Sequence, residues 1–250
     1  MNFCVISPVP GLRHFATLST THLVLSHITH STYMTFYRER RDAGDTLILD
    51  NSAYERKVSS PDRDLEYALM FYQPQICILP DKINDPTITL SRSLRFLDKN
   101  MERFREVEWM FVVHQKPKGD YLESVVAAVL DRRVGHSISW LGIPRCLTTD
   151  HKLSRAVAAK SLTYEGLKFH ALGMVDGSIG ELLELREAGF ASVDSSAPVW
   201  RGWMGHSLRD RRREWSDIPC NFTSPPELSP VNRELILHNL EMCGVKRPTE

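Results

Sequence analysis

The stretch FHALGMVDGSIGELLELREAGFASVDSSAP, residues 169–198, holds one complete strand–helix–strand unit. Two short apolar runs, 169–173 and 191–195, flank a leucine-rich segment with helical spacing. Gly189 follows that segment, at the position where a helix-ending glycine is common. Continuous apolar runs are typical of strands buried on both faces, as in parallel sheets. The unit therefore predicts two parallel strands joined by a crossover helix.

Six further apolar, β-branched runs precede this unit. They are FCVIS (3–7), HLVLS (22–26), TLILD (46–50), QICILPD (75–81), WMFVVHQ (109–115) and SISWLGIP (137–144). Most are separated by segments suited to crossover helices, namely 62–72, 89–104, 121–133 and 154–165. Eight strands alternating with helices predict an α/β fold, a single (β/α)8 TIM-type barrel. The alternative is an open doubly wound sheet, but the sequence has neither a GxGxxG nor a P-loop motif to support it.

The length of 250 residues also suits one barrel, which commonly takes roughly 250 residues as a single unit. We expect residues 1–218 to form the barrel. We expect residues 219–250 to form a C-terminal loop and helix packed on it, because a Pro/Ser-rich stretch there precedes a helical segment from Pro230 to Met242.

Composition limits the functional classes. The chain has 31 Lys+Arg and 31 Asp+Glu, a balance that argues against coating nucleic acid through bulk charge. No apolar run approaches the roughly 18 residues of a membrane span, and no secretory signal opens the chain, so we expect no membrane association. The five cysteines are odd in number and scattered, as in reduced thiols. These features predict a cytoplasmic location.

Polar residues stand where the predicted strands end. They are Asp50, Asp81, His114, Gln115, Gly142, Gly173 and Asp194. Barrel enzymes place their chemistry at the carboxyl ends of the strands. Three carboxylates at one mouth repel each other unless a ligand, proton or cation intervenes, so they indicate a functional site. The alternative for each Asp is a turn or helix cap, which we expect for Asp85 before Pro86, and His114 is expected to be a hydrogen-bonded core histidine.

Six segments occur in the order of motifs of a known family. They are LDNSAYE (49–55), LPDKIND (79–85), FVVHQ (111–115), SWLGIP (139–144), HALGM (170–174) and ASVDSSAP (191–198). They resemble the D-S-G-G-[FY], base-binding Asp, I-V-Q-G, G-L-[AS]-[VI]-G, L-M-G and F-D-C-x-x-P segments of the tRNA-guanine transglycosylases, the queuine/archaeosine tRNA-ribosyltransferases. The chain is shorter than the tRNA enzymes. It looks most like the compact phage and bacterial relatives that place 7-deazaguanine bases into DNA.

The resemblance implies a role for each matching residue. Asp194 is the nucleophile that attacks C1′ of a guanosine, and Asp50 is the general acid/base for the departing and incoming bases. The base-binding residues it implies are Asp81, Gln115, Gly142, Tyr54, Leu172 and Met174. Asp81 and Gln115 bind the edge of the base, Gly142 presents its backbone, and Tyr54 stacks on one face with Leu172 or Met174 on the other. The second substrate is a free 7-deazaguanine base such as 7-cyano-7-deazaguanine.

The residue types agree with this chemistry. A carboxylate that attacks an anomeric carbon forms a covalent glycosyl-enzyme, and a second nucleophile resolves it with net retention. One ionised Asp and one proton-shuttling Asp are the minimum pair, and no cofactor is expected. The family's zinc cluster has no counterpart, because only Cys220 and Cys243 follow Asp194, 23 positions apart. We therefore expect no metal.

The segment WRGWMGHSLRDRRREW (200–215) follows the predicted nucleophile strand. Its candidate nucleic-acid-binding residues are Trp200, Arg201, Trp203, Arg209, Arg211, Arg212 and Arg213. Basic side chains contact phosphates, and aromatic rings stack on unpaired bases. The alternative is a solvated helix face whose tryptophans pack against the barrel.

The main prediction is a guanine-exchange transglycosylase acting on DNA, with tRNA as the alternative substrate. A hydrolytic nucleoside or DNA N-glycosidase using the same Asp pair is a second class, since water instead of a base resolves the intermediate. A non-enzymatic partner subunit is a third class, although the presence of Asp194 argues against it. A phosphate-binding barrel, using the glycines of LGMVDGSIG (172–180), is a fourth. A homodimer or a partner subunit is compatible with each.

Overall fold

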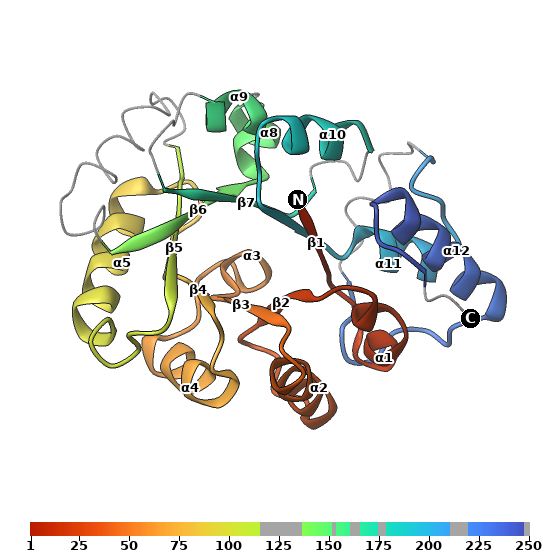
Figure 1. Ribbon diagram of the computed structural model, residues 1–250, viewed down its shortest axis with the longest axis horizontal. Coiled ribbons are helices and arrows are strands. Elements are labelled where there is room, and N and C mark those ends of the chain that lie inside the picture. Colours follow the sequence, from red (N-terminus) through yellow and green to blue (C-terminus); the bar gives the residue numbers. More distant parts are fainter. Residues whose placement is uncertain (116–136, 152–153, 161–165, 175–178, 211–219, 248–250) are drawn as a thin grey trace.

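Figure 1 shows the computed structural model, which describes residues 1–115, 137–151, 154–160, 166–174, 179–210 and 220–247. These residues include eight strands that form one sheet. The strands are β1 (Asn2–Val5), β2 (Thr21–Leu25), β3 (Thr46–Asp50), β4 (Ile76–Ile78), β5 (Glu108–Val112), β6 (Ile138–Pro144), β7 (Lys168–Leu172) and β8 (Ser192–Ser195). All hydrogen-bonded neighbours are parallel, in the order β1-β8-β7-β6-β5-β4-β3-β2.

The sheet curls until its two end strands, β1 and β2, lie side by side (Figure 1). Side chains join them across this seam. The Ser19 hydroxyl oxygen lies 2.7 Å from the Phe3 carbonyl oxygen and 2.9 Å from that of Thr21. The Asn2 side-chain amide donates to Thr21 Oγ1 at 3.3 Å. The expected (β/α)8 TIM-type barrel is thereby confirmed.

Helices connect the strands around the outside of the ring (Figure 1). The main described helices are α2 (Ser31–Asp42), α4 (Asp62–Tyr72), α5 (Pro86–Asn100), α9 (Arg155–Lys160), α10 (Ile179–Glu187) and α12 (Pro230–Met242). The other helical segments are η1 (Val9–Gly11), α1 (Leu12–Phe15), η2 (Ala16–Leu18), α3 (Ala53–Arg56), α8 (Cys146–His151) and α11 (Ala197–Trp203). The helix expected at 121–133 lies outside the described residues. The first connection contains only the short helical segments η1, α1 and η2.

The strands are apolar on both faces because the barrel interior covers one face and the helices cover the other. Leu47, Ile48 and Leu49 of β3, for example, have no solvent-exposed surface. None of the described helices is long and apolar enough to cross a bilayer.

The C-terminal helix α12 packs on α11, directly after β8. Gly202 of α11 allows the close approach, because a Cβ there would lie 2.6 Å from Ile236 Cγ1 and 2.8 Å from the Ile236 backbone. Asn239 of α12 ties the pair together: its amide donates to the carbonyl of Pro198 at 3.1 Å, and its oxygen accepts from the Leu208 amide at 2.9 Å. The contact fixes the chain that leaves the last strand.

We predict that Gly202→Ala lowers the free energy of unfolding by about 1–3 kcal/mol, because the added methyl group forces two helix backbones apart. Chemical denaturation measures the change. Val231→Ala, at a 76 % exposed position on α12, is the matched control and is expected to have little effect. An unchanged denaturation midpoint for Gly202→Ala would show that the two helices can move apart without loss of folding free energy.

Candidate active site

Asp194 of β8 is held inside the barrel mouth by two hydrogen-bond donors on the same carboxylate oxygen. His170 Nε2 and the Gly173 amide each lie 3.0 Å from Oδ1. His170 Nδ1 lies 2.7 Å from Ser192 Oγ, on the same strand as Asp194. With Nε2 donating to the carboxylate, the hydroxyl of Ser192 donates to Nδ1. The direction of the Asp194 carboxylate is therefore fixed from two neighbouring strands.

A buried arginine supports the backbone that holds Asp194. Gly173 has a φ of +68°, a left-handed conformation that suits glycine. Arg155 Nη1 donates to the carbonyls of Gly173, Leu172 and Ile143 at 2.7, 3.1 and 3.3 Å. Glu181 of α10 accepts from the same guanidinium, which is almost fully buried. The ends of β6 and β7 are thus joined to two helices.

Asp50, the last residue of β3, is a second carboxylate at the mouth. Its Oδ2 accepts from the Ser52 amide at 2.8 Å. Burial raises the pKa of Asp50 well above its usual range, and the negative charges of Glu55, Asp194 and Asp81 raise it further. A raised pKa favours the protonated form of the carboxyl group, which suits Asp50 to donate a proton.

Glu55 of α3 is a site residue that the sequence analysis missed. Its side chain is exposed at the surface of the mouth, yet the protein around its carboxylate removes part of the water that would stabilise the charged form, which raises its pKa. The negative charge of Asp194 raises the pKa of Glu55 further. Glu55 ends the segment LDNSAYE (49–55), five residues after Asp50. This closeness to a predicted site residue was the feature of the sequence that could have identified it.

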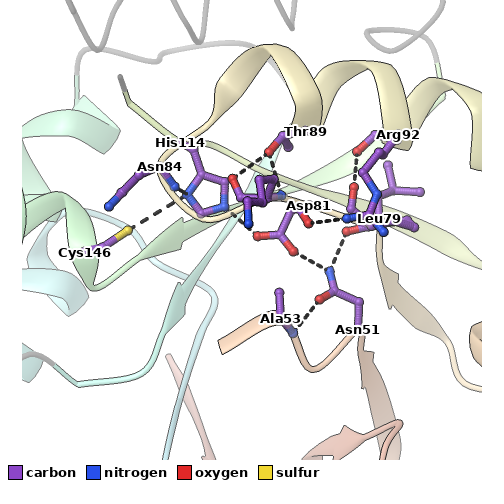
Figure 2. Close-up of polar contacts among 12 residues, drawn as sticks. Asn51, Ala53, Leu79, Asp81, Asn84, Thr89, Arg92, His114 and Cys146 are labelled. Carbon is purple, nitrogen blue, oxygen red and sulfur yellow. Dashed lines mark hydrogen bonds and ion pairs between the residues drawn. The ribbon is translucent and has the colours of Figure 1, made fainter. Parts of the chain in front are cut away.

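Asp81 follows β4 and is held by residues from the two adjacent strand ends (Figure 2). Its Oδ1 accepts from Asn51 Nδ2 at 2.9 Å, and its Oδ2 lies 2.5 Å from His114 Nε2. Asn51 also donates to the Leu79 carbonyl at 2.6 Å. The expectation that His114 is a hydrogen-bonded core histidine is confirmed, and its partner is a predicted site residue.

Helix α5 fixes the loop that carries Asp81. Arg92 Nη1 donates to the Asp81 carbonyl at 3.3 Å, and Ser93 Oγ donates to the Pro80 carbonyl at 3.1 Å. Asp85 Oδ1 accepts from the Ile88 amide at 3.0 Å at the start of the helix, as expected for an N-cap residue. The loop is therefore held by its own helix.

Gly142 of β6 occupies a crowded place in the barrel. A Cβ there would lie 3.0 Å from Leu172 Cδ1 and 3.2 Å from Met110 Sδ. Leu172 is half-buried and Met174 is buried after β7. Gln115 is half-buried after β5. Gln115, Leu172 and Met174 lie at or beyond the ends of β5 and β7, whereas Gly142 lies within β6, two residues before its end.

Tyr54 of α3 is the most exposed of the predicted base-binding residues, at 51 %. Cations lie over its ring: Lys57 Nζ is 4.8 Å and Arg145 Cζ is 5.4 Å from the centroid. A base that stacks on a covered face of Tyr54 takes the place of one of these cations. Neither cation was predicted from the sequence.

The expectation that the tryptophans of residues 200–215 stack on bases is wrong for Trp200 and Trp203. Both side chains are buried, as is Arg201, and Trp203 Nε1 donates to the Pro226 carbonyl at 2.8 Å. They pack in the protein because α11 lies between the barrel and α12. Arg209 is exposed, while Arg211, Arg212 and Arg213 lie outside the described residues.

In the described part of the chain, no group of three or more His, Cys, Asp or Glu side chains is placed to hold a metal ion. All five cysteines are free thiols. Residues 175–178 of the glycine-rich 172–180 segment lie outside the described residues.

No protein-family model matches the chain, and no curated protein matches it.

We predict that Asp50→Asn raises the melting temperature, and more so at pH 8 than at pH 5. A carboxyl group with a raised native pKa binds a proton in the folded state that the unfolded state releases, so stability falls as pH rises from about 4 towards the native pKa. The side-chain amide of the Asp50→Asn variant does not ionise, so this pH-dependent loss of stability disappears. Its oxygen still accepts the hydrogen bond from the Ser52 backbone N–H. Each kcal/mol gained is worth about 2–4 °C.

Melting curves across this pH range measure the effect. Asp42→Asn, on the exposed end of α2, is the control and is expected to follow the wild-type curve. Parallel curves for wild type and Asp50→Asn would contradict a protonated Asp50.

Proposed function

We propose that this protein is a base-exchange transglycosylase that replaces guanine in DNA with a 7-deazaguanine base through a covalent Asp194–glycosyl intermediate. The observation that carries the proposal is the meeting of Asp50, Asp81 and Asp194 at one barrel mouth in three different environments. Asp194 is fixed by donors, Asp50 has a raised pKa, and Asp81 is held by an amide and an imidazole. Different environments assign different tasks to carboxylates of the same type.

The first displacement uses Asp194 and Asp50. A carboxylate oxygen of Asp194 forms a bond to C1′ as the bond from C1′ to the guanine nitrogen breaks. Asp50 gives its proton to the departing guanine, which leaves neutral. In the second displacement the incoming base gives its nitrogen-bound proton to Asp50, attacks C1′ and releases Asp194. Two inversions give net retention at C1′.

Asp81 supports recognition of a guanine-like base. The base edge presents the N1–H and the exocyclic amino group, both hydrogen-bond donors, and a carboxylate accepts from both. Each oxygen of Asp81 already accepts one hydrogen bond, from Asn51 or His114, and each has a second lone pair. The existing bonds hold the carboxylate in place for the base.

The cations around Tyr54 support a nucleic-acid substrate. Lys57 and Arg145 lie beside an exposed aromatic ring at the mouth, a combination suited to a phosphate backbone and an unstacked base. A polymer has to deliver its guanosine extruded from the stack. The resemblance to compact DNA-modifying relatives favours DNA over tRNA, and cytoplasmic DNA is the proposed partner.

Base exchange tests the proposal directly. The protein is incubated with DNA and, separately, with unmodified tRNA, each with radiolabelled guanine or 7-cyano-7-deazaguanine. We expect label to enter DNA with wild type and with the control Asp42→Asn, and to fall by at least about 10³-fold with Asp194→Asn. Label in tRNA alone would overturn the DNA assignment. Release of free guanine without an added base would indicate the hydrolase. If neither labelled polymer nor free guanine is found, the proposal is contradicted.

We further predict that His170→Asn lowers kcat of base exchange by about 10–100-fold and leaves KM nearly unchanged, because a small displacement of the nucleophile affects the reaction more than base binding. Steady-state kinetics with DNA and the labelled base measure both constants. His14→Asn, at an exposed position of α1, is the control. A rise in KM alone would show that His170 serves binding instead.

A further inference from the structure

Four polar side chains form a row around the mouth, one from the end of each of four neighbouring strands (Figure 2). Asn51 follows β3, Asp81 follows β4, His114 follows β5 and Cys146 follows β6. Each contacts the next: Asn51 donates to Asp81, Asp81 meets His114, and Cys146 Sγ lies 3.9 Å from His114 Nδ1. The proposed base exchange uses Asp81 and leaves His114 and Cys146 without a chemical task.

The contacts of His114 define its proton positions. Nε2 lies 2.5 Å from Asp81 Oδ2 and donates to it. The backbone N–H of Asn84 donates to Nδ1 at 3.4 Å, so Nδ1 is the unprotonated nitrogen. Nδ1 has one lone pair, and the Cys146 thiol lies on the same side of the ring (Figure 2), so the thiol donates to Nδ1 in place of the long Asn84 hydrogen bond. A carboxylate that fixes the tautomer of an imidazole beside a thiol is the arrangement that activates cysteine nucleophiles.

Cys146 differs from the other four cysteines. Burial raises the pKa of Cys4, Cys77, Cys220 and Cys243, which keeps their thiols protonated and unreactive. Cys146, like Cys220, is half-buried, and among the described residues it is the cysteine for which a contact with a histidine is drawn in Figure 2. Its place at the mouth brings it within the region proposed to bind the base.

We propose that Cys146, His114 and Asp81 form a thiol–imidazole–carboxylate group whose thiol adds reversibly to the nitrile carbon of a 7-cyano base. The identity of the nitrile rests on the proposed function, while the activation of the thiol rests on the geometry alone. Asp81 and Cys146 lie on opposite sides of the His114 ring (Figure 2). For the nitrile to meet the thiol, a base bound by Asp81 at one edge has to extend past this ring with its other edge.

The addition balances without an outside reactant. The Cys146 thiol passes its proton to His114 Nδ1, and the sulfur forms a bond to the nitrile carbon. One carbon–nitrogen π bond breaks, and its electron pair takes the proton from the imidazolium. The product is a thioimidate, and the reverse steps release the intact nitrile. The bond holds the 7-cyano base at the mouth and discriminates against guanine, which has no nitrile.

Alkylation with iodoacetamide tests the activated thiol. Peptide mapping by mass spectrometry follows each cysteine over time. We expect Cys146 to react at least about tenfold faster than the half-buried Cys220, and His114→Asn to remove most of this advantage. His14→Asn is the control and is expected to leave the rate unchanged. Equal rates for the two cysteines, or no effect of His114→Asn, would overturn the activation.

The nitrile assignment is tested on the Asp194→Asn protein, in which base exchange is blocked. Incubation with 7-cyano-7-deazaguanine is expected to add the mass of one base under non-denaturing mass spectrometry. The same protein with Cys146→Ser is expected to show no covalent addition, and guanine is expected to give none. Because noncovalent binding also adds this mass, the adduct has to survive collisional activation that strips the base from the Cys146→Ser protein.

The outcomes separate the two proposals. An adduct without base exchange in the wild type would support the thiol group and contradict the transglycosylase. Base exchange without an adduct would support the transglycosylase and overturn the nitrile assignment. Rapid alkylation without an adduct would likewise overturn the nitrile as the ligand of Cys146.

Discussion

The parallel pairing of eight short strands is the constraint on which the site depends. Because every strand runs in the same direction around the barrel, residues distant in sequence meet wherever strands end. Asp50, Asp81 and Asp194 belong to different strand–helix units, yet they are close enough for their charges to act on one another. The seam at Ser19 keeps the ring nearly closed. The connections outside the barrel determine only how firmly each end is held.

Several acidic groups in one mouth would repel each other if all were ionised, and the protein treats each differently. Asp194 receives hydrogen bonds from His170 of β7 and from Gly173 just after it, and Asp81 is held by Asn51 and His114. Burial and neighbouring charge raise the pKa of Asp50 and so oppose its ionisation. These different environments reduce the repulsion between the carboxylates. They also give each carboxylate its own proposed role, as nucleophile, base-binding group or proton donor. Stability and chemistry therefore depend on the same contacts.

Much of the fold was predictable because it depends on local patterns. Each of the eight apolar runs became a strand within a few residues of the expected place, and the segments 62–72 and 230–242 became helices with those bounds. The carboxylates at the strand ends were predictable for the same reason, since a strand end is visible in the sequence. The prediction for Trp200 and Trp203 was wrong because α12 covers α11. Helix α12 is distant in sequence from the barrel strands, so no local sequence pattern indicates this packing.

The sequence by itself determined the strand–helix alternation, the parallel barrel and the positions of the three aspartates, because hydrophobic periodicity and chain polarity are local properties. Only the tertiary structure decided what each aspartate touches. His170 reaches Asp194, and His114 links Asp81 to Cys146, across strand pairs whose register is fixed by the closed sheet. The pKa of Asp50 likewise depends on burial and on charges from other strands. Hydrogen-bond partners and desolvation are properties of the assembled barrel, so no single segment specifies them.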